Sequence, residues 1–471
     1  MCFSKLNRVK APETSDVPSS QIGAIGANRL KASVVYSALI AALGGLLFGF
    51  DTAVISGTTD LLKSHFVLTD NSLGFTVASA LIGTIIGAIG VGRPADALGR
   101  RGILFILAVL YFVSALGCAL AWDWWSFMTF RFLGGIAVGG ASVASPMYIA
   151  EISPARFRGR LVAFAQFNIV LGVLLAYLSN YIIVSLQLGE SQYRWMFGVM
   201  AAPSAAFFLL LFFTPQSPRW LVARNRLAEA RVVLEKCGTD AGGIEDEIRE
   251  IQASLDVQHH ELTEPFFCRK YLKPILLAVA IAMFNQLSGI NAILYYSGHI
   301  FEMAGASAKL ASLQSVIIGF INLAVTVAAM MVIDHFGRRR LMIVGSIGYI
   351  VSLIATAFAF YTNQGGVLVL VSLLVFIASH AFGQGAVIWV FISEIFPNRV
   401  RARGQALGTF THWVMCAAIS WTFPIIAAKS GGNIFAFYAV CMVGQLVWVL
   451  LVMPETKGIS LERIQKHLGI E

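Results

Sequence analysis

The chain has 471 residues, of which 57% are hydrophobic and only 13% are charged. This composition leaves too little polar surface to cover a soluble particle, so the expected solvent is lipid. The formal net charge of +9 would suggest an anionic partner in a soluble protein, but here most basic residues fall in loops on one face of the predicted topology. We therefore predict that these charges orient the chain in a lipid bilayer and that it binds no nucleic acid.

Twelve apolar stretches follow one another along the chain, and each is long enough to cross a bilayer as a helix. They are centred near residues 45, 82, 112, 136, 170, 208, 285, 325, 353, 374, 415 and 447. Their apolar runs are continuous and lack the alternation that is typical of an outer-membrane barrel. The sequence therefore predicts an all-α membrane protein with twelve transmembrane helices.

A polar, charged stretch separates the first six spans from the last six. Its mixture of charged and spaced apolar residues is typical of short amphipathic helices at a membrane surface. The positive-inside rule predicts that this stretch and both chain termini lie on the cytoplasmic side of a plasma or inner membrane. The predicted segments are an N-terminal segment 1–32, a first six-helix bundle 33–214, a helical linker 215–271, a second bundle 272–453 and a C-terminal tail 454–471.

The two groups of six spans carry the same charged residues at the same spacing. Asp-x-x-Gly-Arg-Arg occurs at 96–101 and again at 334–339, and a glutamate is followed by arginine seven residues later at 151 and at 394. Such repetition indicates two bundles of one design and one orientation. Parallel repeats of this kind place a substrate at their interface near mid-membrane and permit rocking between inward and outward states.

Five motifs occur in one order along nearly the whole chain. They are Gly92-Arg-Pro-Ala-Asp-Ala-Leu-Gly-Arg-Arg101, Pro146-Met-Tyr-Ile-Ala-Glu151 with Arg158-Gly159, Pro215-Gln-Ser-Pro-Arg-Trp-Leu221, Gln286-Leu-Ser-Gly-Ile-Asn291 and Pro454-Glu-Thr-Lys-Gly458. With these motifs the chain resembles the sugar porters of the major facilitator superfamily, which include facilitative glucose carriers and proton-linked xylose and hexose symporters. The resemblance implies alternating-access transport of a monosaccharide, a hexose or a pentose, by two six-helix bundles, without a cofactor or metal.

The repeated charges have two explanations that can hold together. They can serve only to orient the helices, or, as the resemblance implies, they form a cytoplasmic gate whose members pair when the inner side closes. A gate that opens in each cycle needs only weak pairs, and exposed ion pairs contribute about 0–1 kcal/mol each. The predicted gate residues are Asp96, Arg100, Arg101, Glu151, Arg158, Asp334, Arg338, Arg339, Glu394 and Arg401.

Several amides lie within the predicted spans, where side chains that both donate and accept suit the hydroxyl groups of a sugar. An unmatched hydroxyl in such surroundings costs roughly 2–7 kcal/mol. Gln286 and Asn291 are five residues apart, so both reach one cavity only if the helix is irregular at Gly289 or the cavity is broad. The candidate amides are Gln166, Asn285, Gln286, Asn291 and Asn322.

The resemblance assigns sugar contacts to four of these amides, Gln166, Gln286, Asn291 and Asn322, and adds a set of aromatic residues. Trp389 is assigned a direct contact, and Phe48, Tyr295, Tyr296 and Trp413 a lining or gating role. The alternative for the amides is hydrogen bonding between helices, which is worth under about 1–2 kcal/mol.

Three departures from the family pattern leave the sugar open. Asn285 stands where many relatives have a glutamine, the stretch from Gly383 to Trp389 lacks prolines, and His412 stands where relatives have an amide. A neutral imidazole can replace an amide in a sugar site, and the alternative for His412 and for His380 is a pH-sensing role.

Asp51 is the lone carboxylate within the first predicted span, and Arg131 is the basic residue within another span. Placing a carboxylate there costs roughly 2.5–3.5 kcal/mol, which marks Asp51 as a functional candidate. Pairing would keep Asp51 charged, whereas protonation would release Arg131. The proton-coupled members of the family have aspartate at this position, which favours sugar/proton symport over facilitated diffusion of a sugar or of a polyol such as inositol. A static buried pair is the structural alternative.

Functions other than transport are disfavoured by the sequence. A multispan membrane enzyme would need a catalytic constellation, and we find no His-Glu-x-x-His motif, Ser/His/Asp arrangement or phosphate-binding Gly-Lys-Ser/Thr loop. The expected partners are therefore a monosaccharide, a proton and the bilayer.

Overall fold

The computed structural model describes residues 31–154, 156–239, 243–261, 265–457, 459 and 461–470. Most of the predicted N-terminal segment 1–32 therefore lies outside the described residues. Within these ranges, twelve helical segments are long and apolar enough to cross a membrane, and no strand occurs. The predicted all-α architecture with twelve spans is confirmed.

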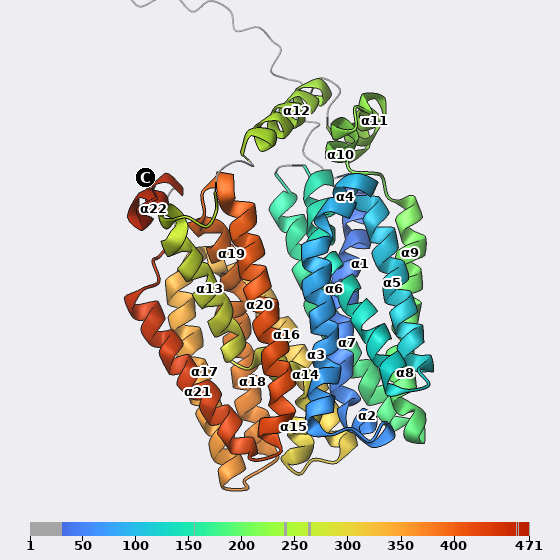
Figure 1. Ribbon diagram of the computed structural model, residues 1–471, viewed down its shortest axis with the longest axis vertical. Coiled ribbons are helices and arrows are strands. Elements are labelled where there is room, and N and C mark those ends of the chain that lie inside the picture. Colours follow the sequence, from blue (N-terminus) through green and yellow to red (C-terminus); the bar gives the residue numbers. More distant parts are fainter. Residues whose placement is uncertain are drawn as a thin grey trace, which may run out of the picture.

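The first six spans form one half of the molecule (Figure 1, blue to green). The helices of this half are α1 Ala32–Val54, η2 Ile55–Gly57, α2 Thr59–His65, α3 Asp70–Gly90, α4 Gly92–Leu98, α5 Arg100–Leu120, α6 Trp124–Ile152, α7 Arg158–Ser185, η3 Gly189–Ser191, α8 Gln192–Gly198, α9 Ala201–Leu210 and η4 Leu211–Phe213.

The last six spans form the other half (Figure 1, yellow to red). Its helices are η5 Arg269–Tyr271, α13 Leu272–Leu287, α14 Ile290–Tyr295, α15 Ser297–Met303, α16 Ala308–Phe336, α17 Arg338–Tyr361, α18 Val367–Phe382, α19 Gln384–Ile395, α20 Asn398–Ala427, α21 Gly431–Leu451 and α22 Leu461–Leu468. Between the halves lie α10 Pro218–Ala223, α11 Leu227–Cys237 and α12 Ile244–Glu261.

Figure 1 gives the molecule two distinct ends. We call the end that carries α4, α10, α11, α12 and α22 the linker end, and the opposite end, with α2, α8 and α15, the far end. The short helices of the linker were predicted from their mixed polar pattern, and their position beside the ends of the spans agrees with that prediction.

Small residues set how closely the spans pack inside each half. A side-chain carbon at Gly135 of α6 would collide with the carbonyl oxygen of Ala80 in α3. The two helices therefore approach backbone to backbone, as small residues permit in membrane bundles.

Two spans are broken in the middle of the second half. Between α13 and α14, Gly289 has φ +84°, a left-handed conformation that glycine adopts without a steric penalty. Of the two geometries that the sequence left open for Gln286 and Asn291, the structure has the irregular helix. The tenth span also breaks, between α18 and α19 at Gly383, although this stretch lacks prolines.

The two halves contact each other at the far end. Trp421 of α20 donates its indole N–H to Asn71 Oδ1 of α3 at 3.0 Å, and its ring lies against Phe75. The Tyr177 hydroxyl of α7 donates to the carbonyl oxygen of Leu294 in α14 at 2.7 Å. At the linker end, the hydrogen bonds of the glutamates at 151 and 394 lie within one half or the other. The structure is therefore closed at the far end.

Candidate functional site

A buried ion pair lies inside the first half. Arg131 of α6 donates from Nη1 to Asp51 Oδ1 of α1 at 2.7 Å, and each residue is only 2% exposed. Two residues that the sequence singled out because charge is costly within a span are thus brought together. Removing one partner of such a pair typically costs about 3–5 kcal/mol, because the other charge stays buried and uncompensated.

Two neighbours of this pair were not anticipated from the sequence. The Phe197 ring of α8 covers the guanidinium, with Arg131 Cζ 5.3 Å from the ring centroid. A contact of this kind contributes about 0.5–2 kcal/mol and needs no hydrogen bond. Gly134 lies behind Asp51, since a side-chain carbon there would be 3.6 Å from Asp51 Oδ1. Phe197 therefore limits the movement of the guanidinium, whereas Gly134 leaves room beside the carboxylate.

A small cavity lies beside the ion pair, on the boundary between the halves. From the first half it is lined by Asp51 and Arg131 among others, and from the second half by Tyr295 of α14 and Trp413 of α20. A change of charge at Asp51 therefore acts directly next to two side chains of the opposite half.

A chain of amides occupies the break between α13 and α14. Gln286 Nε2 donates to Asn285 Oδ1 at 2.9 Å, and Asn291 Nδ2 donates to Gln286 Oε1 at 3.0 Å. Gln286 Nε2 also lies 3.3 Å from both ring nitrogens of His412. Gln286 is fully buried and Asn285 is 2% exposed. The helix break thus brings three predicted sugar-site amides and the histidine into one cluster, with Asn285 positioning Gln286.

Aromatic side chains connect this cluster to the first half. The His412 ring lies 5.2 Å from Trp389 and 5.0 Å from Trp413, between ring centroids. The Phe48 ring of α1 lies 5.8 Å from Trp413. Four of the predicted aromatic and histidine residues therefore form one continuous wall, and Trp413 belongs both to this wall and to the cavity beside Asp51.

The two tyrosines of the seventh span have different surroundings. Tyr295 lines the cavity beside Asp51, and its hydroxyl lies 3.7 Å from Cys416 Sγ. Tyr296 donates to the carbonyl oxygen of Ser420 at 2.9 Å and stacks on Phe423. Tyr296 is thus fixed within the second half, whereas Tyr295 faces the boundary between the halves.

Two predicted sugar contacts are not joined to the amide cluster. Gln166 of α7 is exposed and Asn322 of α16 is 8% exposed. Within the described ranges, neither side chain hydrogen-bonds to Gln286 or Asn291. The other predicted histidine, His380, lies with Nδ1 2.5 Å from the Tyr349 hydroxyl.

Comparison with known proteins decides the family. Residues 37–468 match the family model described as Sugar (and other) transporter. The chain is 39% identical over 472 aligned residues to the D-xylose-proton symporter of Escherichia coli strain K12, with 92% of this chain and 96% of that protein covered. The chain is a sugar porter of the major facilitator superfamily.

Solved structures agree with this family. This sugar porter matches the partially occluded inward-open xylose transporter XylE from E. coli with a TM-score of 0.82 and 37% identity, covering 91% of this chain and all of that one. For the proton:xylose symporter XylE bound to 6-bromo-6-deoxy-D-glucose, the TM-score is 0.76 and the identity is 38%. This match covers 93% of this chain and 99% of that one.

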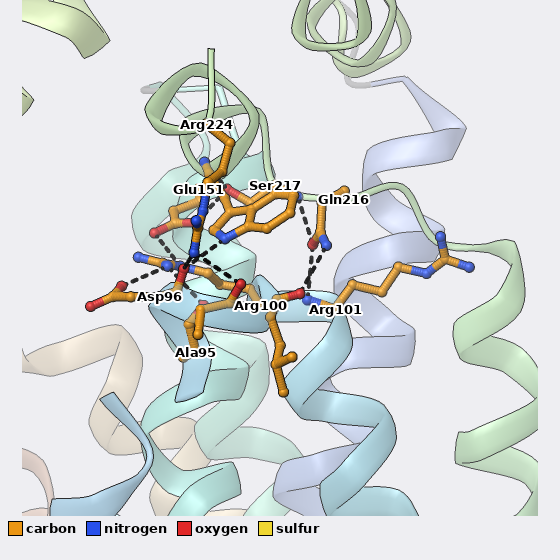
Figure 2. A network of polar contacts seen from close by, with 11 residues as sticks. Ala95, Asp96, Arg100, Arg101, Glu151, Gln216, Ser217 and Arg224 are labelled. Atoms are coloured by element: carbon orange, nitrogen blue, oxygen red, sulfur yellow. Dashed lines mark hydrogen bonds and ion pairs between the residues drawn. The ribbon is translucent and has the colours of Figure 1, made fainter. Parts of the chain in front are cut away.

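At the linker end, the charges of the first half form one network (Figure 2). Arg100 donates from Nη1 to Asp96 Oδ1 at 2.8 Å and from Nε to Glu151 Oε1 at 3.0 Å. Glu151 also accepts a short hydrogen bond from the Ser217 hydroxyl. Arg224 donates to the carbonyl oxygen of Asp96 at 3.1 Å. The network ties α4, α5 and α6 to α10 within this half.

The second half of the sugar porter repeats the arrangement. Arg338 donates from Nη2 to Glu394 Oε1 at 2.8 Å, and the Thr456 hydroxyl donates to Glu394 Oε2 at 2.6 Å. Glu455 accepts the backbone N–H groups of Arg338 and Arg339 at 2.9 and 3.1 Å. Thr456 thus corresponds to Ser217, a correspondence between two loop motifs that the sequence analysis did not draw.

The remaining predicted gate residues do not pair across the halves. Arg101 donates from Nε to the carbonyl oxygen of Leu211, and Arg339 does the same to Val449, each at 3.1 Å. They hold the last turn of the sixth and twelfth spans, where helix carbonyls lack partners. Arg158 donates to the carbonyl oxygen of Ala150 at 3.0 Å.

Two further predicted gate residues lie in the second half. Arg401 Nε and Nη2 have no hydrogen-bond partner within the described part of the chain, and the side chain of Asp334 lies outside the described residues. In this conformation the described contacts of the predicted gate residues lie inside one half or the other. Arg100 and Arg338 are paired within their own halves while the far end is closed, and the pairing of gate residues on closure of the linker end stays a prediction.

Proposed function

We propose that this sugar porter carries a monosaccharide together with a proton by alternating access, with Asp51 as the coupling carboxylate. The observation that carries the proposal is the cavity beside Asp51 and Arg131, because Trp413 lines this cavity and also touches His412 of the amide cluster. The relative named a D-xylose-proton symporter supports the coupling to a proton.

The coupling follows from charge balance in a buried site. With Asp51 ionised, Arg131 is neutralised and the pair has no net charge. When a proton binds to Asp51, the salt bridge loses its negative partner, and the arginine keeps only the Phe197 ring and a neutral acceptor. The arginine can then reorient, which alters the packing around Tyr295 and Trp413 across the boundary.

We propose that sugar binds at the amide cluster and the adjoining wall. Asn285, Gln286 and Asn291 hydrogen-bond to one another in the closed-far-end conformation, so each of these three amides has a partner without sugar. A sugar would exchange these bonds for its own hydroxyl groups, with Trp389 or Trp413 against its ring face. Gln166 and Asn322 belong to the proposed site through the family resemblance, and they would reach the sugar only if the halves move closer.

The remaining assignments are parts of the same proposal. The bundles 33–214 and 272–453 move as two units, and the linker end with both termini faces the cytoplasm. On closure of the linker end, the networks around Arg100 and Arg338 are brought together and act as the inner gate. Between transport cycles each network braces its own half.

The test is a panel of labelled pentoses, hexoses and inositol in proteoliposomes, with and without an imposed pH gradient. Counterflow of one or more monosaccharides, and their accumulation only when the gradient is imposed, is the expected result. Counterflow without accumulation would replace symport by facilitated diffusion. Preference for inositol over every monosaccharide would overturn the substrate class.

A further inference from the structure

A polar cluster crosses between the halves at the far end. His299 of α15 lies with Nδ1 3.0 Å from Asp60 Oδ1 and 3.2 Å from Asp60 Oδ2 in α2. The two residues are 239 positions apart in the chain. Within the described ranges this is the one ion pair between the first half and the second. The cluster is separated from Asp51, which lies in α1 within the span.

The cluster is sheltered but can exchange protons with solvent. The His299 side chain is 22% exposed and that of Asp60 is 42% exposed. Glu302, one turn further along α15, is half-buried on the same side and acts on both residues. The surrounding backbone is tightly packed, because a side-chain carbon at Gly298 would lie 2.7 Å from the carbonyl oxygen of Ser56 in η2.

The charges of neighbouring elements are few. Lys63 of α2 acts on the cluster, and it is itself paired with Asp70 of α3 at 2.6 Å. Lys309 is exposed in the first turn of α16, and Arg194 of α8 lies over the Tyr193 ring and donates to the carbonyl oxygen of Ala119. Helices η2 and α14 carry no charged residue.

The protonation states of the three residues depend on one another. Burial disfavours the charge on His299, but the hydrogen bond and the charge of Asp60 outweigh it and raise the pKa of His299. Burial and the charge of Asp60 raise the pKa of Glu302 to about 7. Burial opposes ionisation of Asp60, yet the hydrogen bond with His299 lowers the pKa of Asp60.

We propose that Asp60, His299 and Glu302 form a second proton-binding site, which holds the two halves together at the far end when it is protonated and releases them when it is not. The ligand is the proton itself, bound at an interface between the halves and apart from Asp51. The proposal rests on the alternating-access motion proposed above, but not on Asp51 or on the identity of the sugar.

The direction of the pH effect follows from the charges. Below neutral pH, His299 is positive, Glu302 is neutral and Asp60 is negative, so the pair across the boundary is intact. As the pH rises through the raised pKa values of His299 and Glu302, the histidine loses its positive charge and the glutamate adds a negative charge beside Asp60. Attraction across the boundary is replaced by repulsion, and the closed far end is destabilised. Acidification below the lowered pKa of Asp60 would also break the pair, so closure is favoured below about pH 7 as long as Asp60 stays ionised.

The experiment measures the distance across the far end with paired spin labels as a function of pH. Labels at Val67→Cys and Gln364→Cys are placed on exposed far-end loops of opposite halves. Cys2, Cys268 and Cys441 are replaced by serine, because Cys118, Cys237 and Cys416 are buried. Between pH 6 and pH 8 we expect the ratio of open to closed far ends to rise by up to about tenfold, the effect of one pKa unit of difference between the two conformations.

Two variants should shift the equilibrium in opposite directions. His299→Gln keeps a hydrogen-bond donor but no charge, so it should favour the open far end at pH 6 and reduce the pH response to the part that Glu302 supplies. Glu302→Gln copies the protonated carboxyl and should keep the far end closed to higher pH. Lys309→Gln, an exposed charge on the adjoining helix, is the matched control and should behave as the unsubstituted protein.

The outcomes separate this inference from the proposed function. A pH-independent distance, or one that responds equally in all three variants, would overturn the second proton site. If Asp51→Asn keeps the distance response while labelled-sugar counterflow fails in the unsubstituted protein, the proposed transport function falls and the second site stands. If counterflow succeeds and the distance does not respond, the reverse holds.

Discussion

Replacing Asp51 with asparagine separates coupled from uncoupled transport. The substitution removes the titrating group but keeps its size and an oxygen that can accept from Arg131, whose Nη1 is 2.7 Å from Asp51 Oδ1. A membrane potential of about 100 mV supplies ~2.3 kcal/mol per charge moved. At about 1.4 kcal/mol per decade this supports roughly fifty-fold sugar accumulation. We expect Asp51→Asn to abolish this accumulation, whereas counterflow down a sugar gradient should continue.

The cost to stability should be limited. Removing one partner of a buried pair costs about 3–5 kcal/mol, but here the amide oxygen still accepts from Arg131 and the Phe197 ring still covers the guanidinium. We therefore expect a folded, monodisperse variant with a lower melting temperature. Glu190→Gln, which alters an exposed carboxylate of the same half, is the matched control and should accumulate sugar like the unsubstituted protein.

The assay is uptake of labelled sugar into proteoliposomes with an imposed potential and pH gradient, beside counterflow without either. If Asp51→Asn loses both counterflow and accumulation, the coupling role is refuted and Asp51 is a structural partner of Arg131. Accumulation retained in the variant would place the coupling proton elsewhere.

Three further predictions concern the sugar site, the linker end and the packing. Asn291→Ala removes the donor to Gln286 Oε1 at 3.0 Å, and calorimetry should show about tenfold weaker sugar binding, since a lost buried hydrogen bond costs about 1–3 kcal/mol; unchanged affinity would make Asn291 a helix-packing residue. Glu151→Gln weakens the network around Arg100 and should slow sugar exchange while leaving affinity within a few-fold, so equal loss of both would contradict the gate assignment. Gly135→Leu should prevent folding because its side chain would collide with the α3 backbone; a wild-type melting temperature would show that α3 and α6 can separate.

The spans and the repeat were predictable because short stretches of sequence identify each span and each copy of the repeated motif. Hydropathy over one helix length marks each span, and all twelve are found. The proximity of Asp51 and Arg131 was also accessible, since a charge within a span is costly alone and few partners are available. That prediction rested on the high cost of a charge within a span, and not on the positions of the two residues in the chain.

Contacts that depend on packing left no such signal. Phe197 covers Arg131, but it is one of 34 phenylalanines in the chain, and nothing in its local sequence distinguishes it. Asn285 was a candidate for the sugar site, but the hydrogen bond that its Oδ1 accepts from Gln286 could not be predicted from the sequence. The pair of Asp60 and His299 depends on how two bundles meet in one conformation, which no single stretch of sequence encodes.

The most direct test of the central claim, that sugar and proton cross together, is proton movement during sugar entry. Unsubstituted protein is placed in proteoliposomes in weak buffer without an imposed gradient, a monosaccharide that gave counterflow is added outside, and the external pH is recorded. We expect a rise in external pH with sugar entry, with one proton per sugar because Asp51 can carry one. Sugar entry without any change in external pH would contradict it.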